Sequence, residues 1–328
     1  MSKDLFRKRN IGLFIKVAIA FVALWFIYQE VQVKDQETDL SFGIDFLLAT
    51  DQLPYLLGLV LLMLVNWTLE AYKWKTLIQH IEQISMLKSL KAIFSGITIA
   101  IFTPNRIGEY GGRIFHLQKA DRIDATLLTI VGSYAQLVVT LATGITASIF
   151  FIPNHVGIGP LTPIQFNLIG LLMFGVAAFL VVLFLNTRLL TNIIKRSPVP
   201  KKYHHYAEVF QYHSTGTLWR VFLASLGRYM IFTFQFFLLL RIFDVAVNYA
   251  DAMMMISMTY FVMTAVPTIA ITELVTRGAV ATKFLEILSP NVSGIVSASS
   301  MLWLINLAVP ALIGVIFIFQ LKFFRKSD

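Results

Sequence analysis

The chain has 328 residues, of which 57% are hydrophobic and only 14% are charged, and its mean hydropathy is +0.73. A soluble globular domain carries about 25% charged residues, so the composition excludes a protein that has water as its only solvent. The formal net charge of +9 would favour nucleic acid in a soluble protein. In a membrane protein, lysine and arginine gather in cytoplasmic loops, and we therefore expect no nucleic-acid partner. The absence of cysteine excludes disulfides and thiolate metal sites.

Six apolar segments are long enough to cross a bilayer, which requires about 20 mostly apolar residues. They lie near residues 11–28, 53–74, 125–152, 166–185, 219–243 and 295–319. The longest polar connection, residues 186–216, is basic, and we expect it to lie on the cytoplasmic surface. The sequence predicts an all-α, multi-pass protein of the cytoplasmic membrane, folded as one transmembrane domain over residues 1–328 with no separate catalytic domain.

The charges between the spans set the expected orientation. The first ten residues hold four basic side chains and one acid, whereas residues 29–52 hold six acids and a single lysine. Basic residues follow the second span, fill the 186–216 connection and end the chain. Because positive residues favour the cytoplasmic side, we expect both termini to be cytoplasmic.

Two further apolar segments are each broken by a proline. Residues 92–117 are interrupted at Pro104 and residues 252–288 at Pro267. If the first segment crossed the membrane once, the basic 186–216 connection and the C-terminus would lie outside, against the positive-inside rule. An arm of residues 92–103 would span only about 18 Å as a helix, less than the roughly 30 Å hydrocarbon core. We therefore predict two re-entrant helical hairpins. Two conventional spans in each place would satisfy the charges equally well.

The two hairpins share a pattern of charged residues. Each has a proline, a glutamate five or six residues later and an arginine four residues after that, which gives the pairs Glu109–Arg113 and Glu273–Arg277. Residues four apart lie on one helix face and can form an ion pair. Entered from opposite faces, the hairpins predict an inverted repeat with a site between its halves, a recurring plan among transporters.

Charged residues at bilayer depth need partners or a polar cavity, because each costs about 2.5–3.5 kcal/mol on insertion scales. Purely structural ion pairs are the alternative interpretation. The proposed breaks in the helices are Pro104, Gly108 and Pro267. His116 flanks the first pair, and we interpret Glu70 as an interfacial neighbour of Lys73. The candidate substrate-binding residues are Arg106, Glu109, Arg113, Arg228, Glu273 and Arg277.

The run Thr103-Pro-Asn-Arg-Ile-Gly-Glu109, followed by Arg113, resembles the signature of the lysylphosphatidylglycerol synthase transmembrane-region family, also described as flippase-like. The basic-Trp-basic run at residues 73–75 is similar to that family's exit from its second span. Residues 268–272 lack the glycines that the family usually has between proline and glutamate. In the best-known members this region moves an aminoacylated phospholipid to the outer leaflet, and a fused cytoplasmic domain makes that lipid.

The resemblance implies translocation without synthesis, with a separate lipid synthase as a partner. Other stand-alone members are linked with glycolipid, polyprenyl-phosphate or hopanoid pathways, so the family does not fix the substrate. Our first hypothesis is a lipid translocase for an anionic or zwitterionic headgroup, with no catalytic residue, cofactor or metal. The alternatives are a membrane-embedded transferase acting on a lipid carrier, with Glu109 or Glu273 as base, and a scaffold subunit for a lipid synthase. The sequence does not indicate an oligomeric state.

Overall fold

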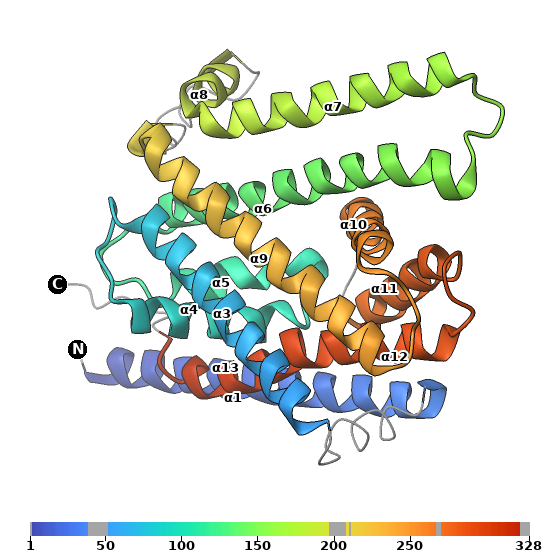
Figure 1. Cartoon of the computed structure of the whole chain (residues 1–328). Helices are drawn as coiled ribbons and strands as arrows, with labels where there is room; N and C mark the ends of the chain where they lie inside the picture. Colours follow the sequence, from blue (N-terminus) through green and yellow to red (C-terminus); the bar gives the residue numbers. More distant parts are fainter. Residues whose placement is uncertain (1, 39–51, 197–207, 210, 267–269, 322–328) are drawn as a thin grey trace.

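A computed structural model describes residues 2–38, 52–196, 208–209, 211–266 and 270–321, and every regular element within these ranges is helical (Figure 1). Six helical segments in them are long and apolar enough to cross a membrane. They agree with the six predicted spans to within a few residues at each end, which confirms the all-α, multi-pass prediction. The segments are Asn10–Gln29, Leu53–Ile78, Arg122–His155, Pro163–Leu185, Thr215–Ile242 and Val292–Ile318.

Local signals explain where several long helices begin. Asp121 precedes α6 and accepts hydrogen bonds from the N–H groups of residues 123 and 124, and Ser214 caps α9 in the same way. These side chains satisfy N–H groups that have no partner within the helix. The long helices are α1 (Ser2–Thr38), α3 (Leu53–Ile78), α6 (Arg122–Phe151), α7 (Pro163–Leu185) and α9 (Thr215–Ile242), and a short α8 (Thr187–Arg196) follows α7.

The sixth span is not a uniform helix. It consists of α12 (Val292–Trp303), a π-helical turn (Leu304–Ala308) and α13 (Val309–Ile318). The N–H of Val309 donates to the carbonyl of Leu304, five residues back. Pro310 follows directly, and a proline has no N–H and clashes with the carbonyl four residues earlier in a regular helix. The wider turn accommodates that proline within the span.

Two pairs of shorter helices lie among the long ones. The first pair is α4 (Met86–Ala100) and α5 (Gly108–Ile114), joined through a 3₁₀ turn (Pro104–Arg106), and the second is α10 (Tyr249–Ala265) and α11 (Ala270–Leu285). In Figure 1 the first pair lies toward the end of the molecule where α1 begins and α13 ends, and the second toward the opposite end. Helix α4 begins six residues earlier than the predicted segment, because Ser85 caps it by accepting from the N–H of Lys88. Pro267 lies outside the described residues.

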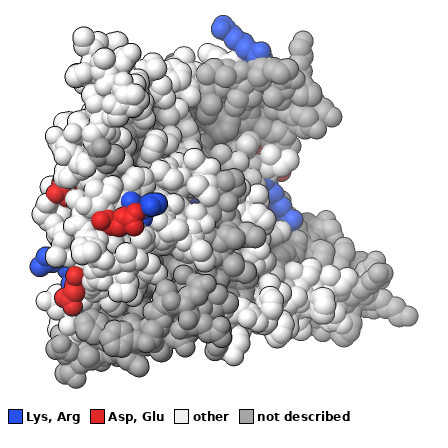
Figure 2. Space-filling model, turned by 90° about the vertical axis from the view of Figure 1, so that its right-hand side faces the viewer, with Lys and Arg blue, Asp and Glu red and all other residues white. Residues whose placement is uncertain are grey.

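Glycines bring the first helix pair close together and close to α13. A Cβ on Gly112 of α5 would lie 2.4 Å from the Cα of Gly96 on α4, so no side chain fits there. A Cβ on Gly314 of α13 would lie 2.1 Å from the carbonyl oxygen of Phe94. Small residues allow this close approach of backbones between membrane helices. Figure 2 shows the end of the molecule at which α6 ends and α7 begins, and this face carries few charged side chains among its described residues.

Candidate functional site

The turn between α4 and α5 directs an arginine toward the second helix pair. Pro104 begins the turn, and Asn105 and Arg106 both have positive φ angles, 48° and 59°, which non-glycine residues adopt at a cost. Gly108 ends the turn, and a Cβ on it would lie 2.6 Å from the side chain of Ile99. From this position, the Nε of Arg106 lies 3.5 Å from the Oε2 of Glu273. The two helix pairs are therefore joined by an ion pair at the turn.

The structure contains both predicted ion pairs between residues four apart. Arg113 pairs with Glu109, and Arg277 pairs with Glu273. Two of these four side chains are buried, Arg113 at 3% and Glu273 at 8% exposed, whereas Arg277 is 11% and Glu109 24% exposed. The pairs are not equivalent, because only the second also contacts the opposite helix pair.

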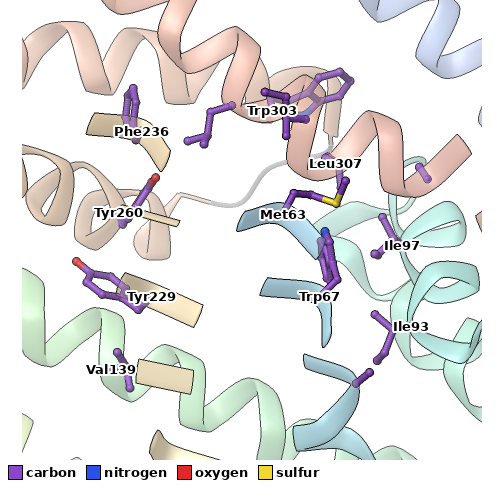
Figure 3. Close-up of a cluster of buried hydrophobic side chains, with 14 of the residues drawn as sticks. Met63, Trp67, Ile93, Ile97, Val139, Tyr229, Phe236, Tyr260, Trp303 and Leu307 are labelled. Carbon is purple, nitrogen blue, oxygen red and sulfur yellow. The ribbon is translucent and has the colours of Figure 1, made fainter. Parts of the chain in front are cut away.

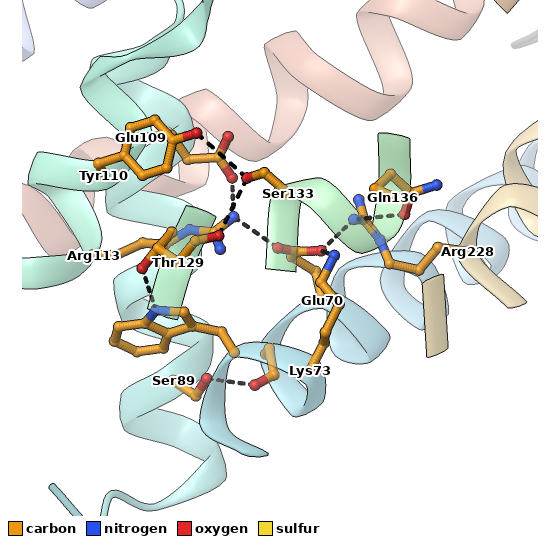
Figure 4. A network of polar contacts seen from close by, with 12 residues as sticks. Glu70, Lys73, Ser89, Glu109, Tyr110, Arg113, Thr129, Ser133, Gln136 and Arg228 are labelled. Atoms are coloured by element: carbon orange, nitrogen blue, oxygen red, sulfur yellow. Dashed lines mark hydrogen bonds and ion pairs between the residues drawn. The ribbon is translucent and has the colours of Figure 1, made fainter. Parts of the chain in front are cut away.

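The prediction that Glu70 lies beside Lys73 is confirmed, but its placement at an exposed interface is wrong. Glu70 is only 4% exposed and lies at the centre of a buried ion network (Figure 4). Its carboxylate is 2.7 Å from the Nζ of Lys73 and 2.8 Å from the Nη2 of Arg113, and it also pairs with Arg228. Glu70 is buried because it lies on the side of α3 that faces α5 and α9, one turn before the buried Lys73.

Arg228 is the most extensively bonded residue of this network. Besides pairing with Glu70, it donates from Nε to the Oδ1 of Asn66 at 2.9 Å and from Nη1 to the Oε1 of Gln136 at 3.4 Å. Its guanidinium also lies 5.3 Å from the ring of Trp67. The network thereby connects α3, α5, α6 and α9. The Nε and Nη1 atoms of Arg228 are both bonded to side chains of the protein.

A cavity of about 480 Å³ lies where the turn of the first helix pair meets the second pair. Its volume falls in the range of small-molecule sites, about 300–1,000 Å³. Four of the six candidate residues line it, namely Arg106, Arg228, Glu273 and Arg277. Glu109 and Arg113 are not among its lining residues and reach it only through Glu70 and Arg228. Most of the remaining wall was not predicted from the sequence, and it includes Asn66, Trp67, Gln136, Tyr260, Trp303 and Asn306.

Aromatic residues form much of this wall. Figure 3 shows Trp67, Tyr229, Tyr260 and Trp303 on α3, α9, α10 and α12, and all four line the cavity. The guanidinium of Arg277 lies 5.9 Å from the centre of the Tyr260 ring. Within the described ranges, several polar atoms of the wall have no hydrogen-bond partner: Trp67 Nε1, Trp303 Nε1, Tyr260 Oη, Arg277 Nε and Asn306 Oδ1.

His116, which follows the first pair in the sequence, is not among the residues that line this cavity. It lies at the base of the first helix pair, beside a smaller cavity of about 320 Å³ that Lys88 and Lys91 also line, and its Nε2 is hydrogen-bonded to Ser95 at 2.9 Å.

Nearby, Glu82 joins the start of α4 to the chain after α5. Burial would raise the pKa of Glu82, but a hydrogen bond from Lys88 and three from the N–H groups of residues 118–120 outweigh burial and lower this pKa to about 2.

The arrangement suits the binding of a polar or charged group inside the apolar molecule. Arginine side chains dominate the cavity, and guanidinium groups form paired hydrogen bonds with carboxylate and phosphate oxygens. In the part of the chain that the structure describes, no group of three or more histidine, aspartate or glutamate side chains is placed to hold a metal ion.

Comparison with known proteins identifies the family to which the chain belongs. The model of the lysylphosphatidylglycerol synthase TM region matches residues 13–314, which include four of the six spans in full, most of the first and sixth, both helix pairs and the cavity between them. No curated protein gives a significant match. The chain thus belongs to the lysylphosphatidylglycerol synthase TM region family, a family of membrane proteins.

Proposed function

We propose that this protein is a lipid translocase of the cytoplasmic membrane, which moves a charged lipid headgroup through the cavity between its two helix pairs. The observation that carries the proposal is the polar cavity itself, which is lined by Arg106, Arg228, Glu273 and Arg277 within a bundle of apolar helices. Ionisable residues at membrane depth are costly, and they normally face a substrate path or one another. Membership of the family supports a role in the membrane.

The two helix pairs are, in this proposal, re-entrant hairpins that enter from opposite faces. Their helices contain 15, 7, 17 and 16 residues. At 1.5 Å per residue these lengths give about 22, 10, 25 and 24 Å, each short of a roughly 30 Å hydrocarbon core. Both termini are then cytoplasmic, in keeping with their positive charge. Broken helices that meet near the midplane provide the binding site in many transporters.

The cavity would replace the water contacts of a headgroup during its passage. A charged group cannot enter hydrocarbon unaided at a useful rate, because its desolvation is too costly. Arg106 is the most exposed ionised side chain of the cavity, at 39%, and its contact with Glu273 is long, at 3.5 Å. A headgroup that bound Arg106 would therefore displace a weak contact, while the acyl chains remained in lipid.

The geometry gives less support to a transferase. Glu273 lines the cavity, but it is held by Arg277 and Arg106, and a carboxylate paired with two cations is a poor base. Glu109 is outside the cavity lining and pairs with the buried Arg113. Neither glutamate is thus placed as a free general base beside a bound lipid.

Leaflet exchange of fluorescent lipids in liposomes that contain the purified protein would test the proposal. We expect exchange above the rate of protein-free vesicles, reduced at least tenfold by Arg106→Gln or Glu273→Gln. Lys283→Gln is a matched control, because Lys283 lies on α11 with Glu273 but is 81% exposed. Exchange no faster than in protein-free vesicles, together with a lipid product of altered mass, would replace the translocase by the transferase. Neither exchange nor a product would favour the scaffold subunit.

A further inference from the structure

The positive charges of the side chains that line the cavity outnumber the negative charges. Three arginines line it, Arg106, Arg228 and Arg277, and one carboxylate, Glu273, which leaves an excess of two positive charges (three minus one). The next carboxylate, Glu70, lies behind Arg228 and is shared with Lys73 and Arg113. Buried cations without counter-charges are unfavourable in a membrane. A ligand that brought negative charge would relieve this excess, and a ligand that brought an ammonium group would increase it.

The arginines also retain unused hydrogen-bond donors. Arg228 donates to protein through Nε and Nη1, and Arg277 donates to Glu273 through Nη2. No hydrogen bond joins Nη2 of Arg228, or Nε of Arg277, to an acceptor in the described part of the chain. Each guanidinium carries five N–H donors, so both arginines keep donors for a ligand.

The neutral residues of the wall favour the same kind of ligand. The indole nitrogens of Trp67 and Trp303 have no partner among the described residues, nor has the hydroxyl of Tyr260. Indole can only donate, and buried polar groups without partners are rare enough to require an explanation. Among the buried atoms without a partner in the described lining residues, the acceptor is the neutral Oδ1 of Asn306. Donors outnumber acceptors among these buried atoms, which suits a group made of oxygen acceptors.

We propose that the cavity binds the anionic phosphate of a lipid that carries no ammonium group, between Arg106, Arg228 and Arg277. The inference rests on the proposed function and narrows its substrate class from anionic or zwitterionic lipids to anionic ones. The family is named for lysylphosphatidylglycerol, whose lysyl group is cationic. An ammonium group is a donor without acceptors, and in this cavity Glu273, already shared by two arginines, is the lone carboxylate among the lining residues. This chain accordingly favours the lipid before aminoacylation over the aminoacylated lipid.

Equilibrium binding to the purified protein in detergent tests the inference without any transport step. Two of the five tryptophans, Trp67 and Trp303, line the cavity, so intrinsic fluorescence is a suitable readout. The probes are dioctanoyl phosphatidylglycerol, its lysyl ester and inorganic phosphate. We expect the first to bind, the lysyl ester to bind at least tenfold more weakly, and phosphate at high concentration to compete with the lipid.

Variants then locate the binding site. Arg277→Gln should weaken binding of dioctanoyl phosphatidylglycerol at least tenfold, and Lys283→Gln, an exposed cation on the same helix, should leave it unchanged. If Arg277→Gln lowers the melting temperature, Arg106→Gln provides the same test at a more exposed position. Trp303→Phe keeps an aromatic ring but removes the N–H, and should weaken binding a few-fold.

The possible outcomes separate this inference from the translocase proposal. Equal or tighter binding of the lysyl ester would overturn the inference, even if leaflet exchange were observed. Phosphate binding without lipid binding would also overturn it, because the ligand would then be a free anion. Selective binding of the anionic lipid in a protein that exchanges no lipid would support this inference and count against translocation.

Discussion

Replacement of Glu70 by glutamine would test whether the buried ion network stabilises the fold. Glu70 is 4% exposed and contacts three cations. The change keeps the size of the side chain but leaves Lys73 and Arg228 without an ion-pair partner in the described structure, whereas Arg113 keeps Glu109. Removal of one partner of a buried ion pair costs about 3–5 kcal/mol, since the other charge stays buried.

We take that cost as a lower bound, because two cations lose their partner. In domains of 150–250 residues, 1 kcal/mol lowers the melting temperature by about 2–4 °C, so the apparent melting temperature should fall by roughly 6–20 °C. Fluorescence-monitored thermal unfolding of the purified protein in detergent would measure the change. The matched control is Glu286→Gln, which removes an exposed ion pair with Lys283; such pairs contribute about 0–1 kcal/mol.

A second variant distinguishes the cost of leaving a buried cation without a partner from the cost of losing hydrogen bonds. Addition of Lys73→Met to Glu70→Gln removes one stranded cation and keeps an apolar side chain of similar length. We expect the double variant to recover part of the lost melting temperature. A melting temperature of Glu70→Gln within about 2 °C of wild type, less than the shift for 1 kcal/mol, would refute the reasoning. So would a loss from Glu286→Gln as large as that from Glu70→Gln.

Three further predictions concern the helix pairs. Gly112→Ala should destabilise the protein, because its Cβ would lie 2.4 Å from a backbone atom of α4, whereas Gly175→Ala, with nothing within 4 Å, should not; similar melting temperatures for the two variants would contradict this packing. At pH 7, Glu82→Gln should be less stable than wild type. Because the folded-state pKa of Glu82 is depressed from 4.5 to about 2, the difference should be complete above about pH 4.5 and vanish as the pH falls toward 2; a constant difference would exclude this cause. In a chain without cysteine, Asn105→Cys and Thr268→Cys should be labelled from opposite faces of the membrane, and labelling from one face would rule out inverted hairpins.

Features set by nearby residues could be predicted from the sequence. Span positions follow from runs of apolar side chains, and the break before α5 follows from the proline and glycine that form its turn. The Glu109–Arg113 and Glu273–Arg277 pairs depend only on the spacing of residues along a helix. None of these features needs knowledge of how distant segments pack.

The partners of the charged residues could not be predicted in the same way. Glu70 meets Arg228 across 158 positions of sequence, and Arg106 meets Glu273 only because the turn after α4 lies beside the first part of α11. One signal was nevertheless present, because the six candidate residues contained four arginines and two glutamates. Four cations against two carboxylates indicated that at least one further buried carboxylate was needed, and Glu70, one turn from Lys73 in a span, was the strongest candidate. The aromatic part of the cavity wall had no comparable signal, because tryptophan and tyrosine also occur throughout ordinary membrane helices.

The π-helical turn at residues 304–308 sets the direction in which the side chains of α13 point relative to those of α12. Trp303 and Asn306 face the cavity, while Gly314, further along the same span, packs against α4. Each residue of an α-helix advances the side-chain direction by about 100°. The wider turn accommodates one residue more than an α-helical turn does, so winding residues 304–308 as a regular α-helix would rotate Gly314 by roughly 90–100° relative to Trp303. The π-helical turn thus keeps two faces of a single span directed at two different neighbours, and a substitution that converted it to an α-helix would move one face out of contact.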